Sequence, residues 1–107
     1  MKKYKIGIAL GGGGSRGFAH MGVLQALNEK GIYPEVVSGT SAGAIVGAFY
    51  CAGFSPMDIY KILKVKKFSD LSKMHIPTDG LFSLDNLRAI LEKNIKQPNF
   101  EDLILPF

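Results

Sequence analysis

Residues 34–43 read Pro34-Glu35-Val36-Val37-Ser38-Gly39-Thr40-Ser41-Ala42-Gly43, a short β-branched run that ends in a serine between two glycines. The run predicts a strand over 34–38. From Gly43 the residues stay uncharged and largely apolar up to Phe54, which predicts a helix with little exposed surface. The order is therefore strand, sharp turn and buried helix, with Ser41 at the turn.

The same order occurs earlier in the chain. Residues 5–10 are mainly apolar and predict a buried strand, and the four glycines of residues 11–14 end it with a tight turn. A helix closing near Gly31 is predicted by one broad apolar face, made of Phe18, Met21, Leu24 and Leu27 with Ala19, Val23 and Ala26 beside them. Alternating strands and helices predict parallel strands joined by right-handed crossovers. We expect a three-layer α/β/α sandwich with a mainly parallel sheet.

The rest of the chain predicts two further helices. Ser55 and Pro56 begin the first as N-cap and first helical residue, with Ile59, Ile62 and Leu63 facing inward. Residues 67–80 have no apolar period and predict an irregular surface loop. Ser83 is expected to cap a second helix, which Pro98 stops and whose apolar face is Leu84, Leu87, Ile90, Leu91 and Ile95. The apolar run at 103–107 predicts that the sheet continues there.

The composition leaves room for one domain over residues 1–107, with a core that needs no disulfide or metal to hold it. The chain has 107 residues, 47% of them hydrophobic, and its apolar stretches are shorter than the roughly 20 residues that a membrane-spanning helix needs. One cysteine excludes an internal disulfide and a cysteine-based zinc site, and no signal-peptide cleavage site follows the basic start. We therefore expect a cytoplasmic protein. The formal charge of +4 is compatible with anionic partners but selects none.

Ser41 is the candidate nucleophile. Small neighbours at Gly39 and Gly43 permit the strained strand-to-helix turn that lifts a hydroxyl clear of the backbone. At the start of the helix the backbone N–H of Ala42 can donate to a developing oxyanion. The alternative is a turn serine that only caps the helix, and the five-residue pattern alone does not decide between the two.

The glycine-rich stretch at residues 11–17 is the second candidate element. Several backbone N–H groups converge there with no side chain in the way, so it can cradle a tetrahedral oxyanion or a phosphate. Residues 12–17 also satisfy the G-x-G-x-x-G pattern of dinucleotide-binding folds. That alternative requires an acidic residue at the end of the second strand, whereas Glu35 comes before Val36 and Val37 and the strand ends in the serine turn. No Lys-Ser or Lys-Thr closes the glycine run, so a P-loop is not indicated either. The two elements together fit acyl transfer best.

These two stretches, residues 10–24 and 39–43, resemble the patatin-like phospholipase family. The resemblance covers the first half of that domain and implies a serine lipid acyl hydrolase with a Ser-Asp dyad and no metal or cofactor. It implies Ser41 as the nucleophile and Arg16, with Gly17, as the anchor of the glycine loop. The implied oxyanion donors are Gly12, Gly13 and Gly14, of which Gly13 and Gly14 are the best candidates.

The resemblance also implies a catalytic aspartate in an Asp-Gly-Gly or Asp-Gly-Ala motif, which these 107 residues lack. Asp79-Gly80 is followed by Leu81 and is interpreted as a surface turn. We therefore expect this chain alone to have little activity. A non-catalytic lipid- or anion-binding remnant of the same fold remains the alternative.

Three other residues invite a catalytic role but have a structural interpretation. His20 lies near the apolar face of the first helix and is expected to be a hydrogen-bonded packing residue. His75 is expected in a loop, and Cys51 in a buried helix.

The expected partner is a lipid or phospholipid, with no nucleic acid. Lys61, Lys64, Lys66, Lys67 and Lys73 interleave with Phe68, Leu71 and Met74. Membrane contact through these lysines is a hypothesis, and a solvated face is the alternative.

Overall fold

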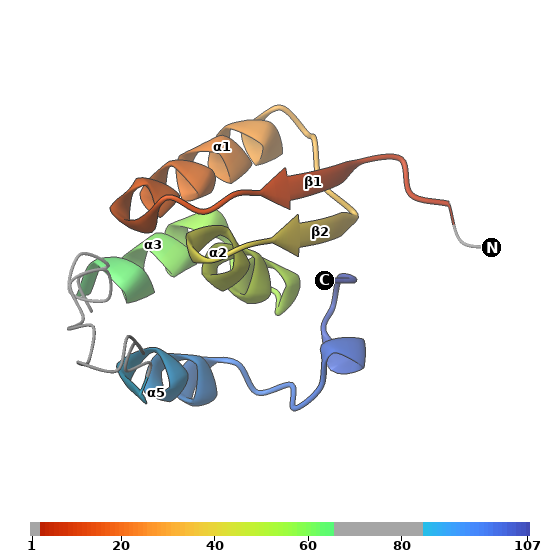
Figure 1. Ribbon diagram of the computed structural model, residues 1–107. Coiled ribbons are helices and arrows are strands. Elements are labelled where there is room, and N and C mark those ends of the chain that lie inside the picture. Colours follow the sequence, from red (N-terminus) through yellow and green to blue (C-terminus); the bar gives the residue numbers. More distant parts are fainter. Residues whose placement is uncertain (1–2, 66–84) are drawn as a thin grey trace.

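The computed structural model describes residues 3–65 and 85–107. Strands β1 (Gly7–Leu10) and β2 (Val36–Gly39) pair in parallel, with Gly7 opposite Val36 and Leu10 opposite Gly39. Figure 1 shows both arrows pointing the same way, with the connections to the next helices leaving from the arrowheads. The predicted order of parallel strands and helices is confirmed, and the chain is a small α/β domain.

Four α-helices accompany the two strands within the described ranges. They are α1 (Phe18–Glu29), α2 (Ala42–Cys51), α3 (Pro56–Val65) and α5 (Asp85–Asn94), with short 3-10 turns η1 (Gly14–Gly17) and η2 (Phe100–Asp102). The predicted start of α3 is confirmed, since the Asp58 N–H donates to Ser55 Oγ at 3.1 Å. Helix α5 ends four residues before the predicted stop at Pro98.

The core lies where α2 packs along both strands and α1 packs against α3. Leu24, Val46, Phe49, Ile59 and Leu63 are fully buried there. Burying an aliphatic or aromatic side chain of this size contributes roughly 1.5–3 kcal/mol. The prediction that α2 has little exposed surface is confirmed, and of the residues predicted to face inward on α3, Ile59 and Leu63 are fully buried and Ile62 is partly buried.

Two predicted surfaces are less buried than the sequence suggested. Within β1 only Leu10 is buried, and Ile6, expected inside the strand, precedes it and is 38% exposed. Val23 on α1 is 49% exposed, so the apolar face of that helix is narrower than predicted. The physical reason at β1 is that its far edge has no strand partner among the residues described.

The C-terminal residues lie along the other edge of the sheet, without forming a strand. The Val37 N–H donates to Pro106 O at 3.0 Å, and the Ile104 and Leu105 N–H groups donate to Cys51 O at 2.8 and 3.2 Å. Phe107 lies against Gly47 of α2. The predicted continuation of the sheet is therefore present only as one hydrogen bond to β2.

The predicted irregular loop over 67–80 and the Ser83 cap lie outside the described residues. In the part of the chain that the structure describes, no helix has the length and apolarity to cross a bilayer.

Candidate active site

Ser41 lies on a strained turn between β2 and α2. Its φ of 52° and ψ of −122° make it the one non-glycine residue with positive φ in the described ranges. Such a conformation costs on the order of 1–3 kcal/mol and persists only where the surroundings impose it. The residue is exposed. The strand-to-helix turn therefore presents the Ser41 hydroxyl to solvent rather than to the core.

Gly39 and Gly43, which flank the turn, lie where there is no room for a side chain. A Cβ at Gly39 would lie 2.6 Å from Gly43 O, and a Cβ at Gly43 would lie 2.0 Å from Leu10 O and 2.6 Å from Gly11 O. These partners are backbone atoms that cannot rotate away. The start of α2 is thus pressed directly onto the end of β1 and the first glycine of the loop.

The hydroxyl of Ser41 does not cap α2, because it makes no capping hydrogen bond. The Gly43 N–H donates instead to Thr40 O at 2.9 Å, and the Ala44 N–H to Ser41 O at 2.9 Å. Ala42 is the first residue of the helix, where a backbone N–H has no partner within the helix. The geometry therefore argues against the capping interpretation and leaves the Ser41 hydroxyl and the Ala42 N–H at the positive end of α2.

The glycine-rich loop lies against this serine. A Cβ at Gly12 would be 3.3 Å from Ser41 Cβ and 3.9 Å from Ser41 Oγ. The Thr40 N–H donates to Leu10 O at 3.0 Å, which ties the end of β1 to the turn. The serine and the loop, predicted separately from the sequence, thus lie within the reach of one ester group.

Backbone freedom shapes the rest of the loop. Gly13 and Gly14 have φ of +139° and +57°, values that side chains disfavour. The Arg16 N–H donates to Gly13 O at 3.0 Å and closes the turn, while the Arg16 side chain is exposed and Gly17 is buried. Arg16 thus holds the loop through its backbone in this structure.

Glu35 lies at the opposite end of β2 from Ser41. It precedes the strand, and its carboxylate accepts a hydrogen bond from the Lys5 N–H at 3.2 Å. A dinucleotide site needs its acidic residue at the carboxyl end of this strand, beside the glycine loop. The geometry therefore argues against the nucleotide alternative.

His20 and Cys51 occupy different surroundings. His20 is half-buried, and its Nε2 lies 2.7 Å from Gly11 O, so the predicted hydrogen bond exists and its partner is the glycine loop. The sequence predicted a hydrogen bond for this histidine but not that its partner is Gly11 O. Cys51 is fully buried at the end of α2, and burial raises the pKa of its thiol to about 11. His75 and Asp79 lie outside the described residues.

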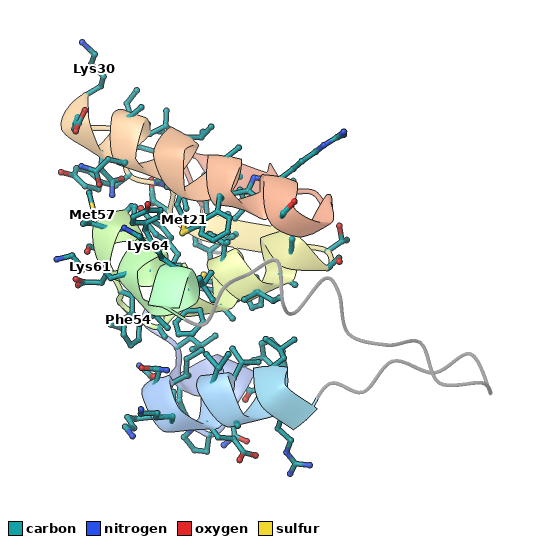
Figure 2. The ribbon with its side chains drawn as sticks, turned by 90° about the vertical axis from the view of Figure 1, so that its left-hand side faces the viewer. Met21, Lys30, Phe54, Met57, Lys61 and Lys64 are labelled. Atoms are coloured by element: carbon teal, nitrogen blue, oxygen red, sulfur yellow. The ribbon has the colours of Figure 1, made fainter. Side chains whose placement is uncertain are left out.

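Part of the predicted lysine cluster lies on α3. Figure 2 shows Met57, Lys61 and Lys64 along this helix, and both lysines are exposed. Lys64 Nζ lies 5.5 Å from the centre of the Tyr60 ring, which meets the Phe18 ring edge-on at 6.0 Å. Phe18 directly follows the glycine loop, so Tyr60 and Lys64 lie near the start of α1. Lys66, Lys67, Lys73, Phe68, Leu71 and Met74 are outside the described residues.

In the described ranges, no group of three or more His, Cys, Asp or Glu residues is close enough to hold a metal ion. What the structure presents is an exposed serine at positive φ on a strand-to-helix turn, beside a glycine-rich loop. The fold and this turn define a small α/β domain whose serine lies where a parallel strand meets a helix.

The chain belongs to the patatin-like phospholipase family. The sequence model of that family matches residues 8–107, which include both the glycine loop and the serine turn.

Individual relatives carry names of the same kind. The chain is 48% identical over 64 residues to the lysophospholipase NTE1 of Saccharomyces cerevisiae, which covers 60% of the chain and 4% of the yeast protein. It is 32% identical over 108 residues to the neuropathy target esterase sws of Drosophila melanogaster, which covers 95% of the chain and 8% of the fly protein. The chain thus spans only a small part of the length of these relatives.

Proposed function

We propose that this chain carries the nucleophile and oxyanion half of a serine lipid acyl hydrolase that cleaves a carboxylic ester, an acyl chain of a phospholipid or related lipid. The observation that carries the proposal is the conformation of Ser41, exposed at positive φ and beside Gly12, where a Cβ would lie 3.3 Å from Ser41 Cβ. A serine that was buried, or whose backbone was unstrained, would give no reason to propose a nucleophile at this turn. The names of the relatives, a lysophospholipase and an esterase, agree with this substrate class.

The proposed chemistry follows from the parts. A base takes the proton of Ser41, and Oγ attacks the acyl carbon to give a tetrahedral oxyanion. The N–H groups of Gly12, Gly13, Gly14 and Ala42 are the proposed donors to that oxygen. Collapse of the intermediate expels the alcohol, which takes up the proton, and water then hydrolyses the acyl-serine to release the fatty acid.

The base is the part that these residues do not supply. The family resemblance implies an aspartate in a motif that the 107 residues lack, and His20 is engaged with Gly11. A serine without its base retains little reactivity, so we propose that the chain alone hydrolyses esters near background. The resemblance also underlies the proposal of a complete three-layer α/β/α sandwich.

Labelling with a fluorophosphonate tests the nucleophile directly. We expect slow covalent labelling of the full chain at Ser41, located by mass spectrometry, and none in Ser41→Ala. Ser38→Ala is the matched control, because Ser38 is also exposed and lies three residues earlier on β2. Labelling that is absent in the parent chain, or equal in Ser41→Ala, contradicts the proposal.

The second candidate, a lipid- or anion-binding remnant, is favoured by the missing base. It predicts no labelling at Ser41 together with saturable binding of phospholipid vesicles. Nucleotide binding, in turn, would raise the melting temperature with NAD or ATP, and we expect no such rise.

A further inference from the structure

The glycine loop is held through its carbonyl oxygens. Leu10 O accepts from the Thr40 N–H at 3.0 Å, Gly13 O accepts from the Arg16 N–H at 3.0 Å, and Gly11 O lies 2.7 Å from His20 Nε2. A carbonyl oxygen has no proton to give, so Nε2 of His20 must be the donor. His20 is the one side chain in this set, since the other two donors are backbone groups.

Each of these hydrogen bonds also fixes the direction of the N–H of the following residue, which belongs to the same peptide group. The described residues contain no cis peptide, and in a trans peptide the carbonyl and the following N–H point in opposite directions. Fixing Gly11 O toward α1 therefore turns the Gly12 N–H away from α1. Gly12 is the loop glycine next to Ser41, since a Cβ built on it would lie 3.9 Å from Ser41 Oγ.

Gly11 needs such a restraint. Its own Cβ position meets nothing within 4 Å, and a glycine has more backbone freedom than any other residue. On one side its carbonyl is approached by the Gly43 backbone, where a Cβ would lie 2.6 Å away. On the other side His20 holds it, so the Gly11–Gly12 peptide is clamped between α2 and α1.

We infer that His20 is a positioning residue that orients the Gly12 N–H as an oxyanion donor for Ser41. The inference rests on the proposed function for its chemistry, and on the Gly11–His20 hydrogen bond for its geometry. His20 acts through the peptide and touches no substrate. It is therefore distinct from the histidine of a catalytic triad, whose ring accepts the proton of the nucleophile.

The test compares His20→Phe, which keeps a ring of similar size without the N–H, with His20→Gln, which restores an N–H donor. The matched control is Gln25→Leu, which removes a side-chain hydrogen bond of the same helix, to Glu29 at 3.1 Å, away from the loop. Two quantities are measured for the full chain: the rate of fluorophosphonate labelling at Ser41, and hydrogen exchange at the Gly12 amide by NMR.

Loss of a whole oxyanion donor slows acyl transfer roughly 100- to 1,000-fold, so misorienting one should slow labelling by about 10-fold or more. We expect this in His20→Phe with faster Gly12 exchange, recovery of most of the rate in His20→Gln, and the parent rate in Gln25→Leu. If His20→Phe does not fold, His20→Leu takes its place.

Labelling of His20→Phe at the parent rate overturns the inference, as does a loss that His20→Gln does not repair. Absence of labelling in the parent chain refutes the proposed function instead. In that case Gly12 exchange alone decides, and an unchanged exchange rate in His20→Phe overturns the positioning role.

Discussion

The two ends of helix α2 each carry a side chain that can act as a nucleophile, in opposite surroundings. Ser41 at the start is exposed, strained and beside the glycine loop, whereas Cys51 at the end is fully buried. The carbonyl of Cys51 is occupied by Ile104 and Leu105, and its Sγ lies 3.8 Å from Pro106 O. A thiol is intrinsically a stronger nucleophile than a hydroxyl. At Cys51, however, burial blocks the approach of a reagent and disfavours ionisation of the thiol.

The largest expected effect is the protection of Cys51. In the folded chain we expect the thiol to react with a disulfide reagent at least about 1,000-fold more slowly than in urea, since reaction requires opening of the core. The measurement is the rate of absorbance change with an aromatic disulfide at pH 8. A thiol that reacts at the same rate with and without urea would remove the contrast between the two helix ends.

The next largest effect is expected from a methyl group added at the start of α2, compared with one added in its middle. Gly43→Ala puts a Cβ into the carbonyls of Leu10 and Gly11, so we expect a loss of at least about 3 kcal/mol in the free energy of unfolding, or no folding. Gly47→Ala meets the edge of the Phe107 ring at 2.6 Å, a side chain that can shift, and should cost about 1–2 kcal/mol. Urea denaturation followed by circular dichroism measures both.

Gly22→Ala is the control for these substitutions. Gly22 lies inside α1 with nothing within 4 Å of its Cβ position, so alanine should stabilise the chain by about 0.5–1 kcal/mol. Equal losses in the free energy of unfolding for Gly43→Ala and Gly47→Ala would contradict this prediction. They would show that backbone atoms move away from an added methyl group as easily as a side chain does.

Raising the pH into the alkaline range should lower the free energy of unfolding through the thiol of Cys51. An exposed thiol has a pKa of about 8.5, and burial raises that of Cys51 to about 11, so the unfolded chain loses its proton first. The stability from this group is complete below pH 8 and is lost as the pH rises to about 11, by on the order of 3 kcal/mol. Burial also raises the pKa of Tyr50, which adds to the loss above pH 10.

Unfolding free energies measured between pH 8 and 11 test this, with Cys51→Ala as the reference variant. A slope in Cys51→Ala as steep as in the parent chain would assign the pH dependence to other groups.

The smallest effect concerns the surface beside the Ser41 end. If Lys61 and Lys64 contact an anionic bilayer, the double variant Lys61→Glu/Lys64→Glu should weaken binding to phosphatidylserine vesicles by at least about 2 kcal/mol, since each lysine contributes about 1 kcal/mol. Vesicle co-sedimentation measures this, and Lys93→Glu/Lys96→Glu, which lies at the end of α5, is the matched control. Unchanged binding would leave these lysines as a solvated face.

The elements that the sequence predicted well are those with a local cause. The helix starting at Pro56 follows from a serine cap, and the turn at Ser41 follows from a strand that runs straight into two glycines. The exposure of Ile6 and Val23 was missed because it depends on which neighbours cover β1 and α1, and periodicity along one element carries no information about that. The contact of His20 with Gly11 was missed in the same way, since a pattern predicts that a histidine is bonded but not to which carbonyl.

The close approach of Gly43 to the carbonyls of Leu10 and Gly11 ties the Ser41 turn to the first residue of the glycine loop. The distance between the two is set by the packing of α2 on the end of β1 and does not depend on a bound ligand. We therefore expect heat or denaturant to disrupt the Ser41 turn and the start of the loop together with the hydrophobic core.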